Sequence, residues 1–224
     1  MFQFKQFAVA DELCAMKVGT DGVLIGAWAD VEGDRRILDL GTGSGLIALM
    51  LAQRNSEAEI LALDIDEQAT LQAQHNFELS PWAKRLSVVN ANVCDYVSER
   101  KFSHIVTNPP YFVDSLHSPD AARTAARHTA SLSFAQIVAS SERLLEPGGK
   151  LSVILPTDVA SLFRREAFEH LWLRRQCDIV TKIGEQPRRT MMEFRFQDRP
   201  IMPRCDTMLM GSEECRAMTE EFYL

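Results

Sequence analysis

Short apolar runs alternate with helix-like segments along most of this chain. The runs lie at 35–40, 59–64, 86–90, 102–107 and 150–156, and the helical segments at 46–54, 66–80 and 133–149. The runs are largely apolar throughout, which is typical of strands buried on both faces. Strands that alternate with helices form βαβ units. We therefore predict an α/β fold whose mostly parallel sheet carries helices on both faces.

The pattern changes after residue 156. Asp158 is predicted to cap a helix that runs to about Leu171. Two strand-like segments at 173–183 and 190–196 are separated by GEQPRR, so we predict an antiparallel C-terminal hairpin that completes a seven-stranded sheet. The residues after Arg199 are too weakly patterned to assign. The 224 residues favour a single domain, with 1–34 as an N-terminal segment, 35–199 as the core and 200–224 as a tail.

A glycine-rich motif, DLGTGSG, follows the first predicted strand. Gly41, Gly43 and Gly45 allow a tight turn and bring a ligand close to the backbone, near the partial positive charge of a helix N-terminus. The dinucleotide fingerprint needs a small residue at 46, so Leu46 weakens a nicotinamide or flavin interpretation. Asp64 ends the next strand 19 residues after Gly45, where a carboxylate can bind both hydroxyls of a ribose. The motif predicts an adenosine-containing cofactor.

Two polar positions near this motif, one of them Asp64, also have a simpler interpretation. Asp64 could cap the helix that follows it. Asn92 or Asp95, after the third run, could accept a hydrogen bond from an adenine amino group, and Asn92 is favoured because it follows the run directly. An asparagine in a loop also commonly bonds its own backbone. Both alternatives stay open.

The fourth run ends in TNPPYF (107–112), where two prolines exclude ordinary helix or strand structure. This run should end at the sheet edge that binds ligands in open α/β folds. There Asn108 and the Pro109 carbonyl could both accept hydrogen bonds from one planar amino group, which favours the tetrahedral nitrogen that attacks an electrophilic methyl group. Pro110 adds rigidity, and Tyr111 offers a face for a flat substrate. We interpret residues 108–111 as a clamp for a planar nitrogen.

Charge, cysteine content and apolar runs indicate which partners and which cell compartment are compatible with this chain. The formal charge of −7 argues against a purely electrostatic nucleic-acid binder, although residues 161–204 hold ten Lys/Arg against six Asp/Glu. The five cysteines are scattered and never form C-x-x-C, which predicts reduced cytosolic thiols and no zinc site. No run of about 18 apolar residues or signal-like start is present, so we expect neither membrane insertion nor export.

DLGTGSG, LALDID and NPPY, in this order, resemble the motifs of S-adenosylmethionine-dependent class I methyltransferases, which have a Rossmann-like fold and act on exocyclic or amide nitrogens. Within that class, the segments at 5–28, 46–54, 79–86 and 126–132 resemble the bacterial valine tRNA methyltransferases that modify N6 of adenine-37. The resemblance extends from about Phe4 to Phe196. It implies S-adenosyl-L-methionine as cofactor, tRNA as partner and a cytoplasmic enzyme of RNA modification.

The resemblance also implies a cofactor site. The glycines would border the methionine moiety and Asp64 would bind the ribose, while Asn92 and Val93 would contact the adenine. The family often has aspartate where this chain has Asn92. The full implied set is Asp21, Asp39, Gly41, Gly43, Gly45, Asp64, Ile65, Asn92 and Val93. Within 18–22, which would fold over the methionine, Asp21 is a candidate partner for the ammonium group, but Thr20-Asp21-Gly22 is equally a good helix start. Lys17 is a weaker candidate.

The implied reaction is direct transfer of a sulfonium methyl group to adenine N6, with residues 108–111 holding the amine and with no metal ion or covalent intermediate. The adenine would leave a single-stranded anticodon loop at little cost. Residues 113–132 are the predicted target-recognition loop, in which Arg123, Arg127 and His128 would contact phosphates. For Arg188 and Arg189 a solvated turn is favoured over an RNA contact.

The histidines have no metal-ligand spacing. His75, His104 and His128 lie in a predicted helix, strand and loop, and are interpreted as ordinary surface or core residues.

Three alternatives remain. A glutamine N5 protein methyltransferase would use the same clamp, but that family carries a helical domain before the glycine motif, where only about 35 residues precede it here. A guanine N2 methyltransferase of ribosomal RNA more often has Phe at the position of Tyr111. A nucleotide- or RNA-binding module without catalysis conflicts with the intact NPPY. A monomer is the default oligomeric state.

Overall fold

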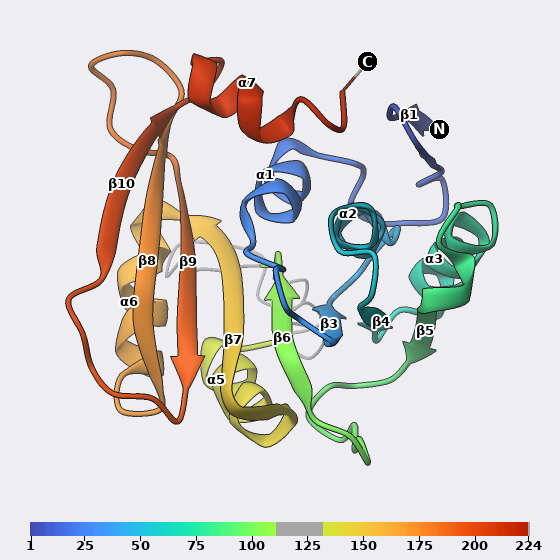
Figure 1. Cartoon of the computed structure of the whole chain (residues 1–224), viewed down its shortest axis with the longest axis horizontal. Coiled ribbons are helices and arrows are strands. Elements are labelled where there is room, and N and C mark those ends of the chain that lie inside the picture. The colour runs from blue at the N-terminus through green and yellow to red at the C-terminus, as the bar shows by residue number, and fades with distance from the viewer. Residues whose placement is uncertain (111–131, 224) are drawn as a thin grey trace, which may run out of the picture.

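A mixed sheet forms the centre of the molecule. The computed structural model describes residues 1–110 and 132–223 (Figure 1). Within them the sheet has eight strands in the order β10-β8-β9-β7-β6-β3-β4-β5. These are β3 (Arg36–Leu40), β4 (Glu59–Asp64), β5 (Leu86–Asn90), β6 (Phe102–Thr107), β7 (Leu145–Pro156), β8 (Leu171–Val180), β9 (Arg189–Phe196) and β10 (Arg204–Leu209). β9 runs antiparallel to β7 and β8, whereas the other neighbours pair in parallel. The predicted parallel sheet and its antiparallel hairpin are confirmed.

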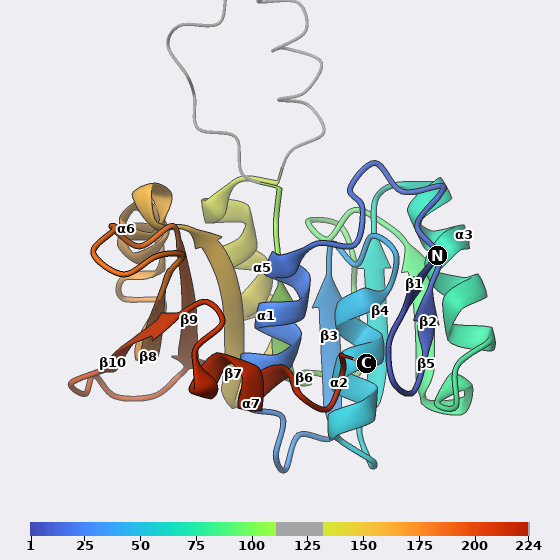
Figure 2. The ribbon, with the colours of Figure 1, turned by 90° about the horizontal axis from the view of Figure 1, so that it is seen from above.

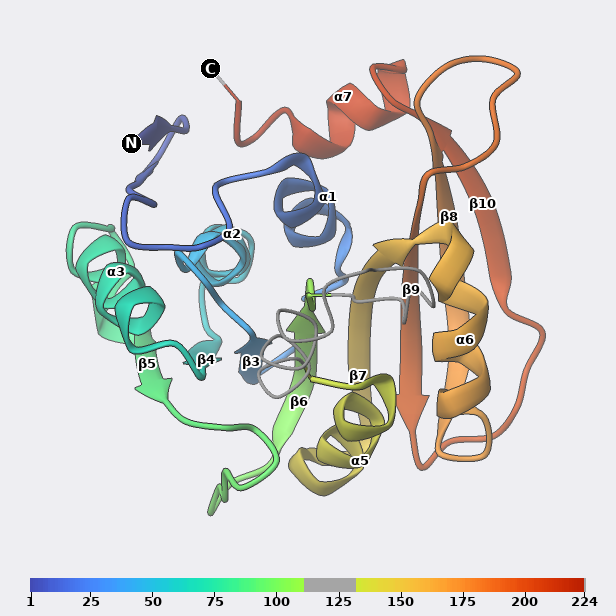
Figure 3. The same ribbon diagram turned by 180° about the vertical axis from the view of Figure 1, so that it is seen from behind.

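Helices cover both faces of this sheet (Figures 1 and 3). One face carries α1 (Thr20–Trp28), α2 (Leu46–Arg54) and α3 (Glu67–Glu78), and the other α5 (Phe134–Leu144) and α6 (Thr157–Ala167). The shorter elements are β1 (Phe2–Gln3), β2 (Ala8–Val9), the 3-10 helix η1 (Ala83–Arg85) and α7 (Glu213–Thr219). Two apolar clusters form the core, one between the sheet and each helical layer.

The strand sequences explain this burial on two faces. In β3, Ile37 and Leu38 are both fully buried. Ile37 belongs to the cluster beneath α1 to α3, and Leu38 to the cluster beneath α5 and α6. Successive side chains of a strand point to opposite faces, so each apolar run supplies both clusters. α5 begins at a capping box in which Ser133 and Gln136 bond each other's backbone, as the serine-headed segment predicts.

Two predicted helix boundaries are wrong. α5 gives way to β7 at Leu145, so the strand begins before the Pro-Gly-Gly that was expected to stop the helix. α6 begins at Thr157, which places Asp158 in its first turn rather than at the cap, and it ends at Ala167 instead of Leu171. The chain leaves the helix because Phe168 is extended and Glu169 has a left-handed φ of 69°.

The unassigned tail adds β10 and α7, and β10 becomes an eighth strand that pairs in parallel with β8. Met208 and Cys215 of the tail enter the cluster beneath α1 to α3. The backbone oxygen of Phe222 then accepts a hydrogen bond from the Lys5 amide at 2.9 Å. These partners lie far away in the sequence, which explains why the local pattern was too weak to assign.

The fold brings the functional motifs to one sheet edge. The neighbours β3, β4, β5 and β6 are parallel, so their carboxyl ends meet on the same side. Figure 2 shows β3 and β4 pointing toward this edge. The glycine motif follows β3, Asp64 is the last residue of β4, and Asn92 and Asn108 follow β5 and β6. Open α/β sheets bind ligands at such an edge.

Candidate active site

A cavity of about 820 Å³ opens at the carboxyl edge of the sheet. Its wall combines the loops after β3, β4, β5 and β6 with the N-terminal segment that leads into α1. Most of the sequence-predicted residues come together here, since the described wall includes Asp21, Gly41, Gly43, Asp64, Ile65, Asn92, Val93, Asn108, Pro109 and Pro110. The volume lies within the range of small-molecule and cofactor sites.

The glycine motif forms a cradle on this wall. A side chain at Gly41 or Gly43 would meet no atom within 4 Å, so the space beside these residues is open. Gly45 has a different function, because it caps α2 with a left-handed φ of 82° and a Cβ there would lie 2.5 Å from the Phe77 ring. A hydrogen bond to the neighbouring strand also fixes the loop, since the Gly43 amide donates to Asp64 Oδ2 at 2.8 Å. The cradle therefore has a fixed shape with room for a ligand.

Asp39 is absent from the described cavity wall and lies beneath the glycine motif. Its side chain is fully buried, and Oδ2 accepts from Thr42 Oγ1 at 2.6 Å and from the Ala48 amide at 3.1 Å. Oδ1 is buried and has no partner among the described residues. Burial raises the pKa of Asp39 to about 7, and the nearby Asp64 carboxylate adds to the rise. Asp39 thus supports the loop and the start of α2, rather than forming the predicted direct part of the cofactor wall.

Asp64 and Ile65 form the next part of the wall. Both carboxylate oxygens of Asp64 accept backbone hydrogen bonds, Oδ2 from Gly43 and Oδ1 from Asp66 at 3.0 Å. Each oxygen has further lone pairs, so a half-buried carboxylate can also accept from ribose hydroxyls. Ile65 leaves 57% of its surface exposed beside it. An exposed apolar side chain in a cavity is suited to pack against a flat ring.

Asn92 makes the local bond of a loop asparagine and also lies on the cavity wall. Its Oδ1 accepts from the Cys94 amide at 3.0 Å, which is the local backbone bond expected of a loop asparagine. The residue also lies on the cavity wall, next to the buried Val93. Its position is compatible with both interpretations of the sequence, because an amide oxygen that accepts one backbone bond has capacity for a second.

Asn108, Pro109 and Pro110 follow β6 directly and line the same cavity as the glycine motif. The end of β6 is fastened to β3, because Thr107 Oγ1 donates to the Leu40 oxygen at 2.8 Å. Within the described part of the chain, no hydrogen bond engages the half-buried Asn108 side chain, so its amide is available to a ligand. Tyr111 lies outside the described residues.

The N-terminal segment is held over the cavity by a residue that sequence reasoning missed. Asn76 of α3 is buried; its Oδ1 accepts from the Ala10 amide at 3.0 Å, and its Nδ2 donates to the oxygens of Ala10 and Ser44 at 2.7 and 2.8 Å. One turn earlier, Gln72 accepts from the Leu13 amide at 3.2 Å. Two buried amides four residues apart are the signal that could have revealed this face of α3.

Asp21 and Arg189 form an ion pair on the cavity wall. Arg189 Nε donates to Asp21 Oδ2 at 2.7 Å. The predicted solvated turn is wrong for Arg189, because the turn delivers its side chain to the cavity. It holds for Arg188, whose side chain is 66% exposed beside Glu185. Asp21 lies in the first turn of α1, so both of its proposed roles, helix start and site residue, are compatible with its position.

Lys17 also lines the cavity, but its ammonium group bonds the backbone oxygens of Asp11 and Glu12. Burial raises the pKa of the neighbouring Cys14 thiol to about 11, so that it stays protonated at neutral pH. Arg123, Arg127 and His128, the predicted RNA contacts, lie outside the described residues.

Within residues 1–110 and 132–223, no group of three or more His, Cys, Asp or Glu side chains is arranged to hold a metal ion. In the same residues, none of the helices combines the length and apolar character needed to cross a membrane.

The sequence is similar to known methyltransferases. Residues 22–171 match the methyltransferase small domain family. A relative from Bacteroides thetaiotaomicron, described as a tRNA1(Val) (adenine(37)-N6)-methyltransferase, is 47% identical over 231 residues, which cover 100% of this chain and 97% of the relative.

Two solved structures share the fold. A predicted O-methyltransferase from Agrobacterium tumefaciens has a TM-score of 0.70 at 20% identity and covers 90% of this chain and 96% of its own. The N-methyltransferase NodS from Bradyrhizobium japonicum, in complex with S-adenosyl-L-homocysteine, has a TM-score of 0.56 at 15% identity, with coverage of 79% and 84%. At these identities the likeness concerns the fold alone, and it confirms the predicted Rossmann-like class I architecture.

Proposed function

The chain belongs to the methyltransferase small domain family, and from this premise we propose that it methylates N6 of adenine-37 in valine tRNA. The observation that carries the proposal is the position of Asn108, Pro109 and Pro110 in the same cavity as the glycine motif. A nitrogen clamp and a cofactor cradle that share one cavity can bring a planar amine to a methyl donor. The 47% identity to a full-length relative with this activity supports the choice of adenine.

The wall fits S-adenosyl-L-methionine, which supplies a methyl group made electrophilic by a sulfonium centre. The open space beside Gly41 and Gly43 would take the methionine moiety, and Asp64 has acceptor capacity for the ribose hydroxyls. Ile65, Asn92 and Val93 would hold the adenine ring between apolar contacts and an amide. This assignment uses the same wall residues that the sequence predicted for the cofactor.

Asn108 and the Pro109 carbonyl act on the target amine. An exocyclic amine of adenine is planar because its lone pair is delocalised into the ring. Two acceptors that take both hydrogens favour the pyramidal nitrogen of the transition state over the flat ground state, so the stabilisation lowers the barrier. The two prolines keep the acceptors in place without a conformational search. Tyr111 is proposed to stack on the adenine.

The RNA partner is proposed to be the anticodon stem-loop, contacted by Arg123, Arg127 and His128. The chain would act as a monomeric, single-domain cytoplasmic enzyme that needs no metal ion. Removing Arg123 and Arg127 together should raise the RNA dissociation constant and flatten its dependence on salt. Unchanged values would remove both arginines from the RNA interface.

The decisive experiment supplies the purified protein with labelled S-adenosyl-L-methionine and unmodified valine tRNA, followed by nucleoside analysis. We expect N6-methyladenosine with the wild-type tRNA and none with a tRNA that carries guanine at position 37. Label in N2-methylguanosine, or transfer to a glutamine of a release factor but not to tRNA, would refute the adenine assignment and favour the corresponding alternative.

A further inference from the structure

Arg189 brings a positive charge to the target side of the cavity. It is the first residue of β9 and pairs with Pro156 at the end of β7. β7 lies beside β6, whose last residue, Thr107, precedes Asn108. The carboxyl end of β7 thus places Arg189 near the clamp, and Arg189 and Asn108 line the same cavity.

The protein fixes the orientation of this guanidinium group. Nε donates to Asp21 Oδ2 at 2.7 Å, and Nη1 donates to the backbone oxygen of Arg188 at 3.0 Å. The N-terminus of α1 favours the negative charge of Asp21. The paired side chains are 31% and 25% exposed, so the pair contributes little to stability but holds the arginine in one direction.

The rest of the described wall offers little positive charge. Its other charged side chains are three carboxylates, from Asp21, Asp64 and Asp66, and the ammonium group of Lys17. Lys17 is exposed and bonds two backbone oxygens of the N-terminal segment. Arg189 and Lys17 are therefore the two cations of the described wall. Arg189 is the one that lies beside the end of β7, next to the strand that leads to Asn108.

We propose that Arg189 binds the RNA backbone phosphate next to the nucleotide whose base enters the clamp, with Asp21 as a positioning residue. This inference rests on the proposed function. A base that leaves its stack and reaches Asn108 brings its flanking phosphates to the mouth of the cavity. Arginine binds phosphate oxygens through paired N–H donors in a fixed geometry. Arg189 thus selects a target amine that belongs to a polynucleotide over one in a free nucleoside.

The test compares neighbouring arginines. For Arg189→Ala we expect an approximately tenfold rise in the dissociation constant for valine tRNA, and a fall of about one in the slope of log affinity against log salt concentration. The dissociation constant for S-adenosyl-L-methionine should stay at the wild-type value. Arg188→Ala removes an equal charge from the exposed side of the turn and should leave both constants unchanged.

Two further variants separate charge from orientation. Arg189→Lys keeps the charge but loses the planar fork, so it should restore the salt slope but only part of the affinity. Asp21→Asn keeps Arg189 and weakens its orientation, so it should raise KM for tRNA several-fold with a smaller change in kcat. Thermal melts of all four variants check that the fold is retained.

Two outcomes would overturn the inference. Wild-type affinity and salt slope in Arg189→Ala would remove the phosphate contact. A rise in the dissociation constant for S-adenosyl-L-methionine with unchanged tRNA binding would assign Arg189 to the cofactor carboxylate, the other anion of the cavity. Either result leaves tRNA methylation by the wild type intact, whereas failure of the wild type to methylate valine tRNA would refute the proposed function itself.

Discussion

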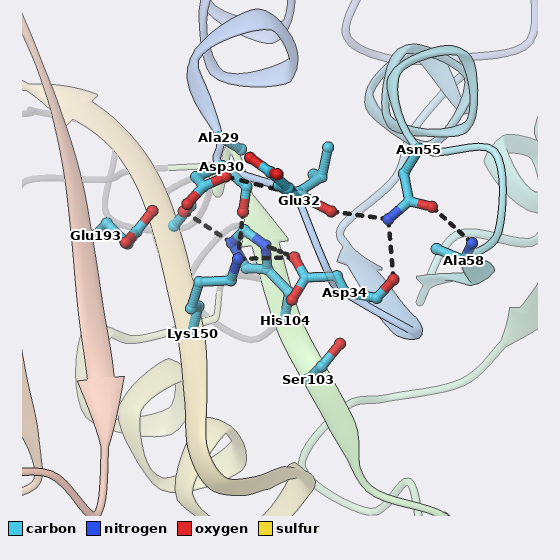
Figure 4. Close-up of polar contacts among 12 residues, drawn as sticks. Ala29, Asp30, Glu32, Asp34, Asn55, Ala58, Ser103, His104, Lys150 and Glu193 are labelled. Atoms are coloured by element: carbon cyan, nitrogen blue, oxygen red, sulfur yellow. Dashed lines mark hydrogen bonds and ion pairs between the residues drawn. The ribbon is translucent and has the colours of Figure 1, made fainter.

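The two ends of the sheet use the same kinds of polar residue for opposite purposes. At the carboxyl end, Asp64 and Asn108 are half-buried and face a cavity. At the amino end, Asp34, His104 and Lys150 are at most 6% exposed and bond one another (Figure 4). A polar group whose partners are all supplied by the protein holds elements together, whereas one that keeps spare capacity at a cavity can bind a ligand. The comparison separates structural from functional polar residues within one fold.

The buried cluster illustrates why contact geometry alone does not identify a site. His104 Nδ1 lies 2.8 Å from Asp34 Oδ2 and its Nε2 lies 2.9 Å from Ser152 Oγ, in the order of an acid, base and nucleophile. Lys150 lies 2.9 Å from the same Asp34 oxygen and bonds the Asp30 backbone oxygen. Yet His104 and Ser152 are fully buried, and the cluster has no place in the described wall of the active-site cavity. It fastens the connection between α1 and β3 to the sheet.

The largest expected effect comes from Asn108→Ala. Loss of one acceptor of the clamp should lower kcat for tRNA methylation about 10³-fold, because the lost interaction is strongest in the transition state. The midpoint of thermal unfolding should change little, since no described hydrogen bond engages this side chain. A fall in stability with only a slight loss of kcat would place Asn108 with the structural residues and break the comparison.

Asp34→Ala should have the opposite signature. It leaves the Lys150 ammonium group buried without its carboxylate, which should cost about 3–5 kcal/mol of unfolding free energy in urea denaturation. Cofactor affinity at low temperature should stay near the wild-type value. Glu59→Ala, which removes an ion pair with Arg100 whose side chains are 61% and 66% exposed, is the control and should cost no more than about 1 kcal/mol. Equal losses would contradict the assignment of a structural role to the cluster.

Two buried asparagines offer a matched pair. Asn76 bonds the backbone of the N-terminal segment and the glycine motif, whereas Asn55 bonds four backbone groups near the amino end of β3, including the Asp34 oxygen. Each change to alanine should cost about 1–3 kcal/mol of stability. Only Asn76→Ala should also weaken S-adenosyl-L-methionine binding, by about tenfold in calorimetry, equivalent to about 1.4 kcal/mol. Equal cofactor affinities in the two variants would show that the Asn76 bridge does not shape the site.

The last comparison is a difference in pH dependence between two buried aspartates. Burial raises the pKa of Asp34, but hydrogen bonds and attraction from His104 and Lys150 together outweigh it and lower the pKa. Its contribution to stability is therefore present above pH 3.8 and lost as the pH falls through the lowered pKa. Burial without a cation raises the pKa of Asp39 to about 7, so stability falls as the pH rises from 3.8 toward 7.

Asp39→Asn should therefore gain stability relative to the wild type over this interval, with a slope of at most about 1.4 kcal/mol per pH unit. Urea unfolding at pH 4.5, 6 and 7.5 measures this slope. A constant difference between the two proteins would show that Asp39 titrates normally.

The sequence predicted those features whose cause is local. Buried runs placed the strands of the core, Ser133 marked the start of α5, and glycines after a strand placed the cradle beside Asp64. Asn108 was singled out because two prolines after a buried strand have few structural explanations, and the structure places it on the cavity wall.

The remaining features depend on contacts between distant parts of the chain. The bridge from Asn76 to residue 10 and the ion pair between Asp21 and Arg189 span 66 and 168 positions, and neither partner marks the other in sequence. Asp39 is the opposite case. The sequence predicted a cofactor contact because Asp39 belongs to the motif, whereas the structure places its side chain beneath the glycine loop.

The N-terminal segment also has a consequence for the order of assembly. Lys5 bonds the backbone near residue 220, across a separation of 215 positions, and Phe4 lies 6.1 Å from the ring of Tyr223. During synthesis, these first residues emerge long before the residues that hold them. Residues 4 and 5 are therefore made first and docked last, whereas Ala10 and Leu13, which lead toward the cavity wall, can bond α3 as soon as that helix has emerged.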